Sequence, residues 1–386
     1  MIKRAIESEI KADLFKGKAI VLIGPRQAGK TTLVKEMLSK RLSDVLFING
    51  DDPNAIKPFL GAGIEQLNNI IGNKTIVFID EAQRLPDIGL IAKMIVDQFK
   101  NVQLILNGSS AFDISQQTQE PLTGRKWTHY LWPISWEEYE NHEGFLKAEQ
   151  TLDNRLVFGF YPDVITRAER QEKTLLEIAD SYLYKDVLIY GNIKKPTLLQ
   201  KLLQALAHQV GHEVSYSEVA QLIGSDPKTV TAYIDLLEKA FVVFRLPAFS
   251  RNLRDEIKTN RKIFFYDNGI RNAVIGQLQP LAARTDVGAL WENFLVSERL
   301  KQIHYNGLNI KGYFWRSKQQ QEIDYVEELN GNVFGFQFKW NEKRNINFSK
   351  TFTDAYQATN QGVTRANFRE FVLIKNATNP SRVDNP

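Results

Sequence analysis

The sequence Val-Leu-Ile-Gly-Pro-Arg-Gln-Ala-Gly-Lys-Thr-Thr occupies residues 21–32 and decides the fold of the first domain. An apolar run typical of a buried strand leads into Gly-x-x-x-x-Gly-Lys-Thr, and a helix with an apolar face is predicted from about Thr31. A loop of this kind wraps a triphosphate with backbone N–H groups at a helix N-terminus. We therefore expect ATP to contact the whole loop, which comprises Gly24, Pro25, Arg26, Gln27, Ala28, Gly29, Lys30, Thr31 and Thr32.

Four side chains have predicted chemical roles in this site. Lys30 supplies a compact cation for the β- and γ-phosphates, and the Thr31 hydroxyl is placed to ligate Mg²⁺. The apolar strand predicted from residue 75 ends in Asp80 and Glu81. Asp80 is expected to hold the Mg²⁺ through water, and Glu81 to polarise the water that attacks the γ-phosphate. The two motifs together predict an enzyme that binds and hydrolyses Mg-ATP.

Two further polar residues are candidates for the same site. Asn107 follows the strand predicted from residue 102, where it either orients the attacking water or forms a turn. Arg125 either stabilises transition-state charge, in cis or from a neighbouring subunit, or pairs with a carboxylate at the surface. Short apolar strands that alternate with helical segments predict a parallel sheet buried on both faces, with ligands beyond the carboxyl ends of its strands.

Composition limits the remaining classes of site and the location. The 386 residues predict two to four domains. The absence of cysteine excludes disulfides and cysteine-based metal sites, and the five histidines show no ligand spacing. The N-terminus is charged where a signal peptide would be apolar, and no apolar stretch approaches the roughly 20 residues of a membrane span. We expect a cytoplasmic protein with no membrane partner.

The middle of the chain is predicted to be mostly helical. Residues 136–206 are expected to form a helical lid over the nucleotide. A capping box at Ser215–Glu218 and an Asp226-Pro227 start predict two short helices, followed by a strand near 241–246. The apolar face of the first helix is expected from Val219, Ala220, Leu222 and Ile223. This order is that of a winged helix, whose second helix either enters a DNA major groove or only packs against protein.

A basic stripe overlaps the end of this region. Between Arg245 and Arg271 seven basic residues stand against three acidic ones, an excess equal to the +4 of the whole chain. The stripe includes Arg251, Arg254 and Lys258. Such a stripe indicates either a nucleic-acid contact or a solvated surface loop.

The last part of the chain contains a hairpin whose register can be deduced. The two-residue loop Asn330-Gly331 pairs Asp324 with Gln337, and Glu322 with Lys339. These four side chains then share one face, because strand side chains alternate. They form either a metal-dependent phosphodiesterase site, in which acids hold a hard cation and the Lys activates water, or a solvated face with cross-strand ion pairs.

The order of these motifs resembles the AAA+ ATPases common in bacteria and archaea. The residues that carry the resemblance are Gly24 to Thr31, Asp80-Glu81, Asn107-Gly108-Ser109-Ser110, Gly124-Arg125 and Pro133-Ile134-Ser135. Nearly the whole chain is similar to members with a winged helix and a restriction-endonuclease-like C-terminal domain. The resemblance implies an α/β fold in which the strand ending at Asn107 lies beside the P-loop strand. It also implies an AAA+ P-loop core (1–135), a helical lid (136–206), a winged helix with a basic linker (207–262) and an α/β restriction-endonuclease-like domain (263–386).

In the last domain, Trp291 to Phe294, Glu322-x-Asp324 and Gln337-x-Lys339 resemble the PD-(D/E)xK nuclease pattern. The resemblance implies that Glu292, Asp324 and Gln337 bind a metal ion and that Lys339 is the catalytic lysine. Gln337 stands where the pattern most often has Glu, which removes one negative charge and lowers Mg²⁺ affinity.

Two functions follow. One is an Mg-dependent ATPase coupled to a C-terminal half that binds nucleic acid, DNA rather than RNA, and acts as a nuclease if its site is active. The other is a nucleotide-gated protein-binding switch with an inactive nuclease-like scaffold, acting with a protein partner or as a homo-oligomer.

Overall fold

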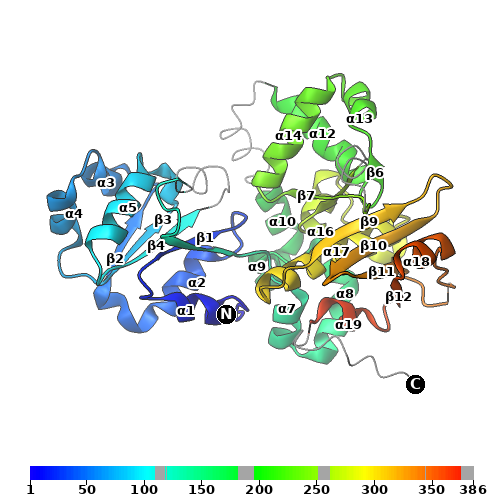
Figure 1. Cartoon of the computed structure of the whole chain (residues 1–386), viewed down its shortest axis with the longest axis horizontal. Helices are drawn as coiled ribbons and strands as arrows, with labels where there is room; N and C mark the ends of the chain where they lie inside the picture. Colours follow the sequence, from blue (N-terminus) through cyan, green and yellow to red (C-terminus); the bar gives the residue numbers. More distant parts are fainter. Residues whose placement is uncertain (109–117, 119, 181–194, 251–260, 344, 375–386) are drawn as a thin grey trace.

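A computed structural model describes residues 1–108, 118, 120–180, 195–250, 261–343 and 345–374. In Figure 1 the chain forms two halves, with the P-loop domain in blue and cyan on one side and all later elements on the other. The segment after β5 (Lys126–Tyr130) joins them.

The first half is built on a five-stranded parallel sheet. Its strands are β1 (Ala19–Ile23), β2 (Val45–Asn49), β3 (Ile76–Asp80), β4 (Gln103–Gly108) and β5, in the order β2-β3-β4-β1-β5. Leu22 of β1 lies beside Asn107 of β4, so the predicted neighbour of the P-loop strand is confirmed. β1, β3 and β4 are buried along their whole length, which confirms a parallel sheet covered on both faces.

Helices pack on both faces of this sheet. One face carries α1 (Glu7–Asp13) and α2 (Lys30–Met37), whose Ile10 and Leu33 share a core cluster with Ile20 of β1. The other face carries α4 (Ile64–Ile71) and α5 (Ile88–Gln98), which pack against Val21 and its neighbours. The short helices of this half are α3 (Pro53–Ile56) and the 3₁₀ turns η1 (Ser39–Asp44), η2 (Lys57–Phe59) and η3 (Ala82–Arg84).

Helices follow the sheet, as predicted. They are α7 (Trp136–Glu143), α8 (Phe145–Phe158), α9 (Pro162–Thr166), η4 (Ala168–Arg170), α10 (Gln171–Ala179) and α12 (Pro196–His208). The Ser135 hydroxyl accepts a hydrogen bond from the Glu138 N–H, and the Glu138 carboxylate accepts one from the Ser135 N–H. This capping box fixes the direction in which the chain leaves the sheet domain.

A small unit of helices and antiparallel strands comes next. It contains α12, β6 (Glu213–Val214), α13 (Tyr216–Ile223), α14 (Pro227–Lys239), β7 (Val243–Leu246) and β8 (Arg261–Phe265), with sheet order β6-β8-β7. Ser215 and Asp226 cap the two helices, as the sequence predicts. Leu222 was expected on the apolar face, but it is 69% exposed. That expectation was wrong because Leu222 lies about 100° around the helix from the stripe formed by Val219, Ala220 and Ile223.

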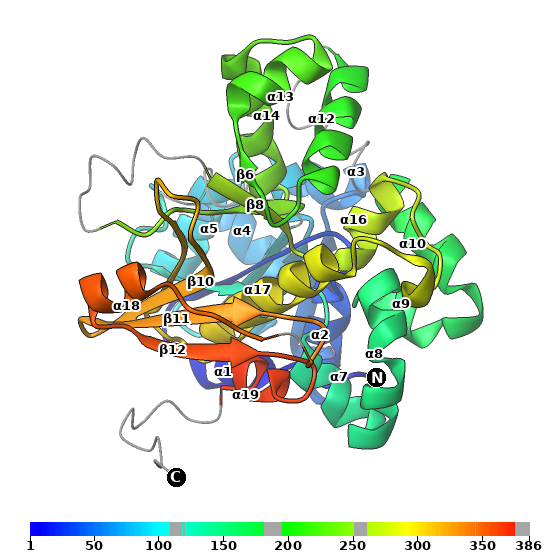
Figure 2. The ribbon, with the colours of Figure 1, turned by 90° about the vertical axis from the view of Figure 1, so that its right-hand side faces the viewer.

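The remaining elements form a mixed sheet and its helices. The sheet order is β12-β11-β10-β9, and the strands are β9 (Lys311–Arg316), β10 (Glu322–Leu329), β11 (Asn332–Phe338) and β12 (Thr359–Val363). The helical elements are α16 (Asn268–Val274), η6 (Leu281–Ala283), α17 (Val287–Tyr305), α18 (Lys350–Tyr356) and α19 (Phe368–Val372). Figure 2 shows α17 crossing behind this sheet. Leu329 pairs with Asn332 and Tyr325 with Phe336, which confirms the predicted hairpin register.

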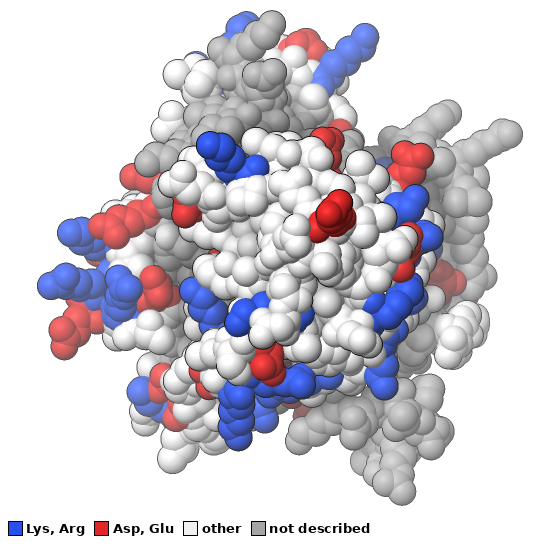
Figure 3. Space-filling model, turned by 90° about the vertical axis from the view of Figure 1, so that its left-hand side faces the viewer, with Lys and Arg blue, Asp and Glu red and all other residues white. Residues whose placement is uncertain are grey.

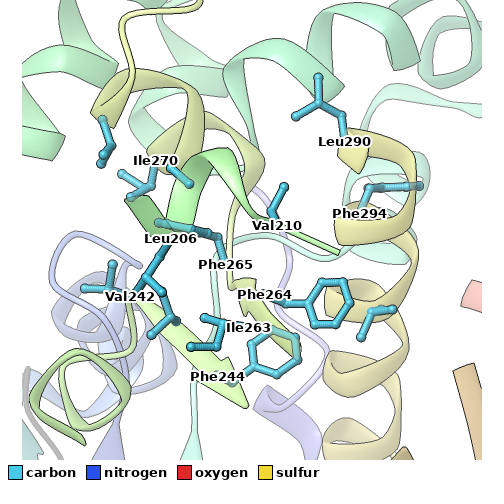
Figure 4. Close-up of a cluster of buried hydrophobic side chains, with 14 of the residues drawn as sticks. Leu206, Val210, Val242, Phe244, Ile263, Phe264, Phe265, Ile270, Leu290 and Phe294 are labelled. Carbon is cyan, nitrogen blue, oxygen red and sulfur yellow. The ribbon is translucent and has the colours of Figure 1, made fainter. Parts of the chain in front are cut away.

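One large apolar core joins most elements of the second half, and a smaller separate cluster packs β9, β10 and β11 against α18. The large core contains side chains from α7, α8, α12, α14, β8, α17 and α19. Figure 4 shows Ile263, Phe264 and Phe265 of β8 among side chains of neighbouring elements that include Leu206 and Phe294. The segment expected to be a separate lid therefore shares its core with the C-terminal elements. Among the described helices, none has the length and apolarity to cross a membrane.

Asn293 of α17 fixes β8 to this core. Its Oδ1 accepts a hydrogen bond from the Phe265 N–H at 2.7 Å, and its Nδ2 donates to the Phe265 carbonyl at 3.0 Å. We expect Asn293→Ala to lower the unfolding free energy by about 2–4 kcal/mol, because two buried backbone groups lose their partners. Asn306→Ala, at the exposed end of the same helix, should cost less than about 1 kcal/mol. Denaturant unfolding measures both, and equal losses would contradict the role given to Asn293.

Candidate functional site

A pocket lies at the carboxyl edge of the parallel sheet, where the P-loop follows β1. It encloses about 440 Å³, and its P-loop-domain wall includes Gln27, Gly29, Lys30, Thr31 and Glu81. The opposite wall comes from other parts of the chain, namely Met1, Ile2, Arg4, Glu7, Ile134, Pro162, Asp163 and Thr166. The size suits a nucleotide. Three segments far apart in the sequence therefore meet around the loop that was predicted to bind ATP.

The backbone of the loop needs glycine and holds Lys30 at its centre. A Cβ at Gly24 would lie 2.0 Å from the Leu131 carbonyl oxygen, and Gly29 has φ +95°. Lys30 is buried, and its Nζ donates to the carbonyls of Gly24 and Pro25, both at 2.8 Å. These are weak partners for an ammonium, so phosphate oxygens can replace them readily.

Thr31, Asp80 and Asn107 form a compact polar cluster beside Lys30. The Thr31 hydroxyl donates to Asp80 at 2.8 Å, and the Asn107 Nδ2 donates to Asp80 Oδ1 at 2.5 Å. Burial raises the pKa of the Asp80 carboxyl, and the Thr31 hydrogen bond opposes that rise. A hydroxyl and a carboxylate are oxygen ligands of the kind Mg²⁺ takes, and a buried carboxylate gains by binding a cation. The residues present therefore fit the Mg²⁺ of a P-loop site.

Glu81 also lines the pocket, in a backbone conformation that is uncommon for Glu. Its φ and ψ are 48° and 44°, and its Oε2 accepts a hydrogen bond from the Gln83 Nε2 at 2.6 Å. A Cβ at Gly50, the residue after β2, would lie 2.3 Å from the Glu81 carbonyl oxygen. The left-handed turn at Glu81 therefore requires a glycine at position 50. Such strain persists where the surrounding structure imposes it, often at functional sites.

The structure separates the two remaining candidates. Asn107 lies within hydrogen-bond distance of Asp80 and Thr31, at the metal end of the pocket. Arg125 precedes β5, where its carbonyl accepts a hydrogen bond from Ala19 at the start of β1. It is therefore one strand length, roughly 16 Å, from the P-loop. Its Nε pairs with Asp97 of α5 at 2.7 Å, as expected for an Arg paired with a carboxylate at the surface. From this position Arg125 could act on ATP only at the nucleotide site of a neighbouring subunit.

Sequence reasoning missed Arg4, which joins the P-loop to the second half. Its Nη1 donates to the Ala28 carbonyl at 2.7 Å, its Nη2 to the Trp132 carbonyl at 2.6 Å, and its Nε pairs with Glu138 at 3.1 Å. The Tyr305 hydroxyl, at the end of α17, accepts a further hydrogen bond at 3.3 Å. A lone Arg that precedes the first helix gives no local signal of such contacts.

A second pocket, of about 470 Å³, contains part of the predicted nuclease-like site. Glu292, Asp324 and Lys339 line it together with Gly211, His212 and Trp340. The structure thus brings Asp324 and Lys339 to one side of the hairpin. Gln337 is turned differently, because its Nε2 donates to the Glu322 carbonyl at 2.6 Å. The Phe338 N–H donates to Asp324 Oδ2 at 2.7 Å.

Lys262 of β8 is the residue of this region that sequence reasoning missed. Its side chain is 1% exposed, and its Nζ lies 2.9 Å from Glu292 Oε1 and 2.5 Å from Glu322 Oε1. Burial raises the pKa of Glu292 to about 7, although Lys262 opposes that rise. The only sequence signal was its membership of the basic stripe.

Two other described residues of the stripe also pair with carboxylates of this chain. Arg245 pairs with Asp235 and Glu238, and Arg271 is buried against Asp286. Arg251, Arg254 and Lys258 lie outside the described residues. Figure 3 shows the face of the P-loop domain, where basic and acidic side chains are both present. A solvated loop was the wrong expectation for Lys262 and Arg271, which are 1% and 2% exposed, and both alternatives stay predictions for Arg251, Arg254 and Lys258.

Three family models match successive parts of the chain. Residues 16–140 match a model described as an AAA domain, residues 149–280 a domain of unknown function (DUF8612), and residues 287–385 a domain of unknown function (DUF4143). The first match and the five-stranded parallel sheet support a P-loop, AAA-like nucleotide-binding domain in the N-terminal part.

Similar proteins occur in distant organisms. An uncharacterized protein of Mycobacterium tuberculosis is 25% identical over 87% of this chain and 74% of its own length. One of Methanocaldococcus jannaschii is 22% identical over 84% and 75%, respectively. Among solved structures, the Walker-type ATPase PABY2304 of Pyrococcus abyssi is 16% identical, with a TM-score of 0.48, over 71% of this chain and 96% of that one. A TM-score of this size supports no inference about the present chain.

The raised pKa of Asp80 yields a prediction about stability. A carboxyl whose pKa is higher in the folded state than in the unfolded state costs stability once the pH exceeds its unfolded value near 3.9. Asp80→Asn should therefore raise the melting temperature of the nucleotide-free protein at pH 7, or leave it unchanged, while it removes the predicted Mg²⁺ ligand. The advantage should shrink as the pH falls toward 4. Asp44→Asn, at the opposite edge of the sheet, is the control. A clear fall in the melting temperature of Asp80→Asn would show that the carboxylate stabilises the fold.

Proposed function

We propose that this protein is an Mg-dependent ATPase in which the nucleotide controls the arrangement of the C-terminal half. The observation that carries the proposal is the cluster of Lys30, Thr31, Asp80 and Glu81 around one pocket at the carboxyl edge of the parallel sheet. The match of residues 16–140 to an AAA domain supports the same class of activity.

The residues of the pocket divide the work of hydrolysis. Lys30 would leave the Gly24 and Pro25 carbonyls and bind the β- and γ-phosphates, while the backbone N–H groups of residues 24–32 surround the chain of phosphates. Thr31 and Asp80 would hold Mg²⁺, which neutralises charge on the phosphates. Asn107 would keep the Asp80 carboxylate in place through the hydrogen bond that it already makes. Glu81 would orient and polarise the attacking water.

Arg4 provides the route from this pocket to the second half. The P-loop carbonyl of Ala28 and the Tyr305 hydroxyl share its guanidinium. Nucleotide binding changes the partners of Lys30, two residues from Ala28, so it is expected to alter this shared contact. The elements of the second half that share the large apolar core would then respond as a body.

Two kinds of partner are possible for the second half that the nucleotide controls, namely DNA and another protein. The order α12, β6, α13, α14, β7, β8 and the antiparallel sheet β6-β8-β7 support a winged helix, and exposed Lys228 and Lys239 on α14 would suit DNA. Against this, Arg245, Lys262 and Arg271 of the stripe pair with carboxylates of this chain. We therefore place a nucleotide-gated switch with a protein partner first and DNA binding second. A nuclease activity would need the second pocket to bind a metal ion.

The ATPase site makes a prediction that separates binding from chemistry. Lys30→Ala should abolish ATP binding, because the triphosphate loses its cation. Glu81→Gln should keep ATP affinity within about twofold and lower turnover by about 10²–10⁴-fold, because it keeps the shape and removes the base. Fluorescent-nucleotide titration and phosphate release measure the two effects. Equal losses of affinity in both variants would rule out the role given to Glu81.

The two kinds of partner can be distinguished with purified protein. If the switch has a protein partner, duplex DNA, single-stranded DNA and RNA should leave ATP turnover unchanged, and no binding should appear even at low salt. If the winged helix binds DNA, turnover should rise with DNA, and binding should weaken steeply as salt increases. Lys228→Ala combined with Lys239→Ala should flatten that salt dependence. Arg125→Ala reports separately on a subunit contact, because turnover should fall with unchanged ATP affinity only if Arg125 acts in trans.

A further inference from the structure

A buried cation that belongs to the protein itself is bonded to Glu292, one of the residues that line the second pocket. Lys262 Nζ lies between Glu292 Oε1, at 2.9 Å, and Glu322 Oε1, at 2.5 Å. Its side chain is 1% exposed, whereas the carboxylates are 16% and 30% exposed. Both distances are those of charge-assisted hydrogen bonds, so the ammonium takes the central place in the group of acids.

Three of the oxygen atoms that a metal ion would need, Glu292 Oε1, Glu322 Oε1 and Asp324 Oδ2, are already engaged. Glu292 Oε1 is bonded to Lys262, and a Cβ at Gly211 would lie 3.0 Å from Glu292 Oε2, so backbone packs against the outer oxygen. Asp324 Oδ2 accepts the Phe338 N–H. The Gln337 amide donates its Nε2 to the Glu322 carbonyl. A divalent ion with near-octahedral coordination needs several oxygens that converge on one point. The residues present do not fit the metal ion of a nuclease.

The position of Lys262 is fixed by its backbone. Lys262 is in the middle strand of the β6-β8-β7 sheet, paired with Glu213 on one side and Leu246 on the other. Three residues further along β8, Asn293 makes two hydrogen bonds to the backbone of Phe265. Asn293 is adjacent to Glu292 on α17. The same two elements therefore supply the ammonium and one of its carboxylates, and they cannot separate without breaking a buried contact.

We propose that the ammonium of Lys262 replaces the divalent cation in the nuclease-like pocket, so that Glu292, Glu322 and Asp324 form a metal-independent structural centre. It joins three elements, because Lys262 comes from β8, Glu292 from α17, and Glu322 and Asp324 from β10. A carboxylate group that already holds a buried ammonium has little to gain from a metal ion, and a metal beside Lys262 would meet a like charge. The inference concerns the nucleotide-free protein and does not depend on ATP hydrolysis.

Metal titration of the nucleotide-free full chain tests this directly. Free Mn²⁺ is followed by electron paramagnetic resonance with the wild type and with Lys262→Met, Lys339→Met and Asp324→Asn. We expect the wild type and Asp324→Asn to bind Mn²⁺ equally, because the pocket contributes no site. Lys262→Met should gain at least about tenfold in Mn²⁺ affinity at one site, and Asp324→Asn in the same chain should remove that gain. Lys339→Met, which removes a lysine that lines the pocket, should gain no Mn²⁺ affinity.

Thermal unfolding of the wild type provides a second measurement for the case in which Lys262→Met does not fold. A ligand that binds only the folded state raises the melting temperature, so a metal site in the pocket would give an Mn²⁺-dependent rise that Asp324→Asn abolishes. We expect Mn²⁺ to change the melting temperatures of the wild type and of Asp324→Asn by the same amount. A wild-type Mn²⁺ site that is lost in Asp324→Asn would overturn the proposal. A folded Lys262→Met that gains no Mn²⁺ affinity would overturn it as well.

Discussion

The buried ion pair between Arg4 and Glu138 is the interaction on which the arrangement of the two halves depends. Their side chains are 6% and 2% exposed, with 3.1 Å between Nε and Oε1. A buried pair stabilises a fold only when its remaining donors and acceptors are also satisfied. Here the guanidinium reaches the carbonyls of Ala28 and Trp132, and the carboxylate accepts the N–H groups of Ala5 and Ser135. One charge pair therefore holds the P-loop, the segment after β5 and the first helix of the second half.

Helix α17 extends this arrangement to the second pocket. Tyr305, at its end, contacts Arg4, and Glu292 lies thirteen residues earlier, about 20 Å along the axis. Between them, α17 bonds the segment after β5, because Glu298 accepts the Trp136 N–H and Lys301 donates to the Ile134 carbonyl. The C-terminal part of the helix, from Glu298 to Tyr305, is therefore attached to the joint between the halves. A change at the P-loop that displaced Tyr305 would be carried by a stiff element, and this makes α17 the physical connection between the two pockets.

The parts of the structure that could be predicted are those in which the deciding residues are close in sequence. The P-loop has a fixed spacing and is bounded by an apolar strand and a helix, and Asn330-Gly331 alone determines the register of β10 and β11. Arg4 and Lys262 could not be predicted, because their carboxylate partners lie 134, 30 and 60 positions away. Counting charges along the chain placed Lys262 in a surface stripe. Only the fold shows that a basic residue in a strand of the middle unit meets acids from two later elements.

The carboxylates of Asp80 and Glu292 differ in the donors that they accept hydrogen bonds from. Asp80 takes its hydrogen bonds from neutral groups, the Thr31 hydroxyl, the Asn107 amide and the Glu81 N–H. Neutral donors orient a buried carboxylate without compensating its charge, and so the affinity for a cation is retained. Glu292 is bonded to an ammonium, which offsets part of the cost of burying its charge although burial still raises its pKa to about 7. The identity of the donor, more than the number of acids nearby, therefore distinguishes the carboxylate that we propose to bind Mg²⁺ from the carboxylate that already has a cation of the protein as its partner.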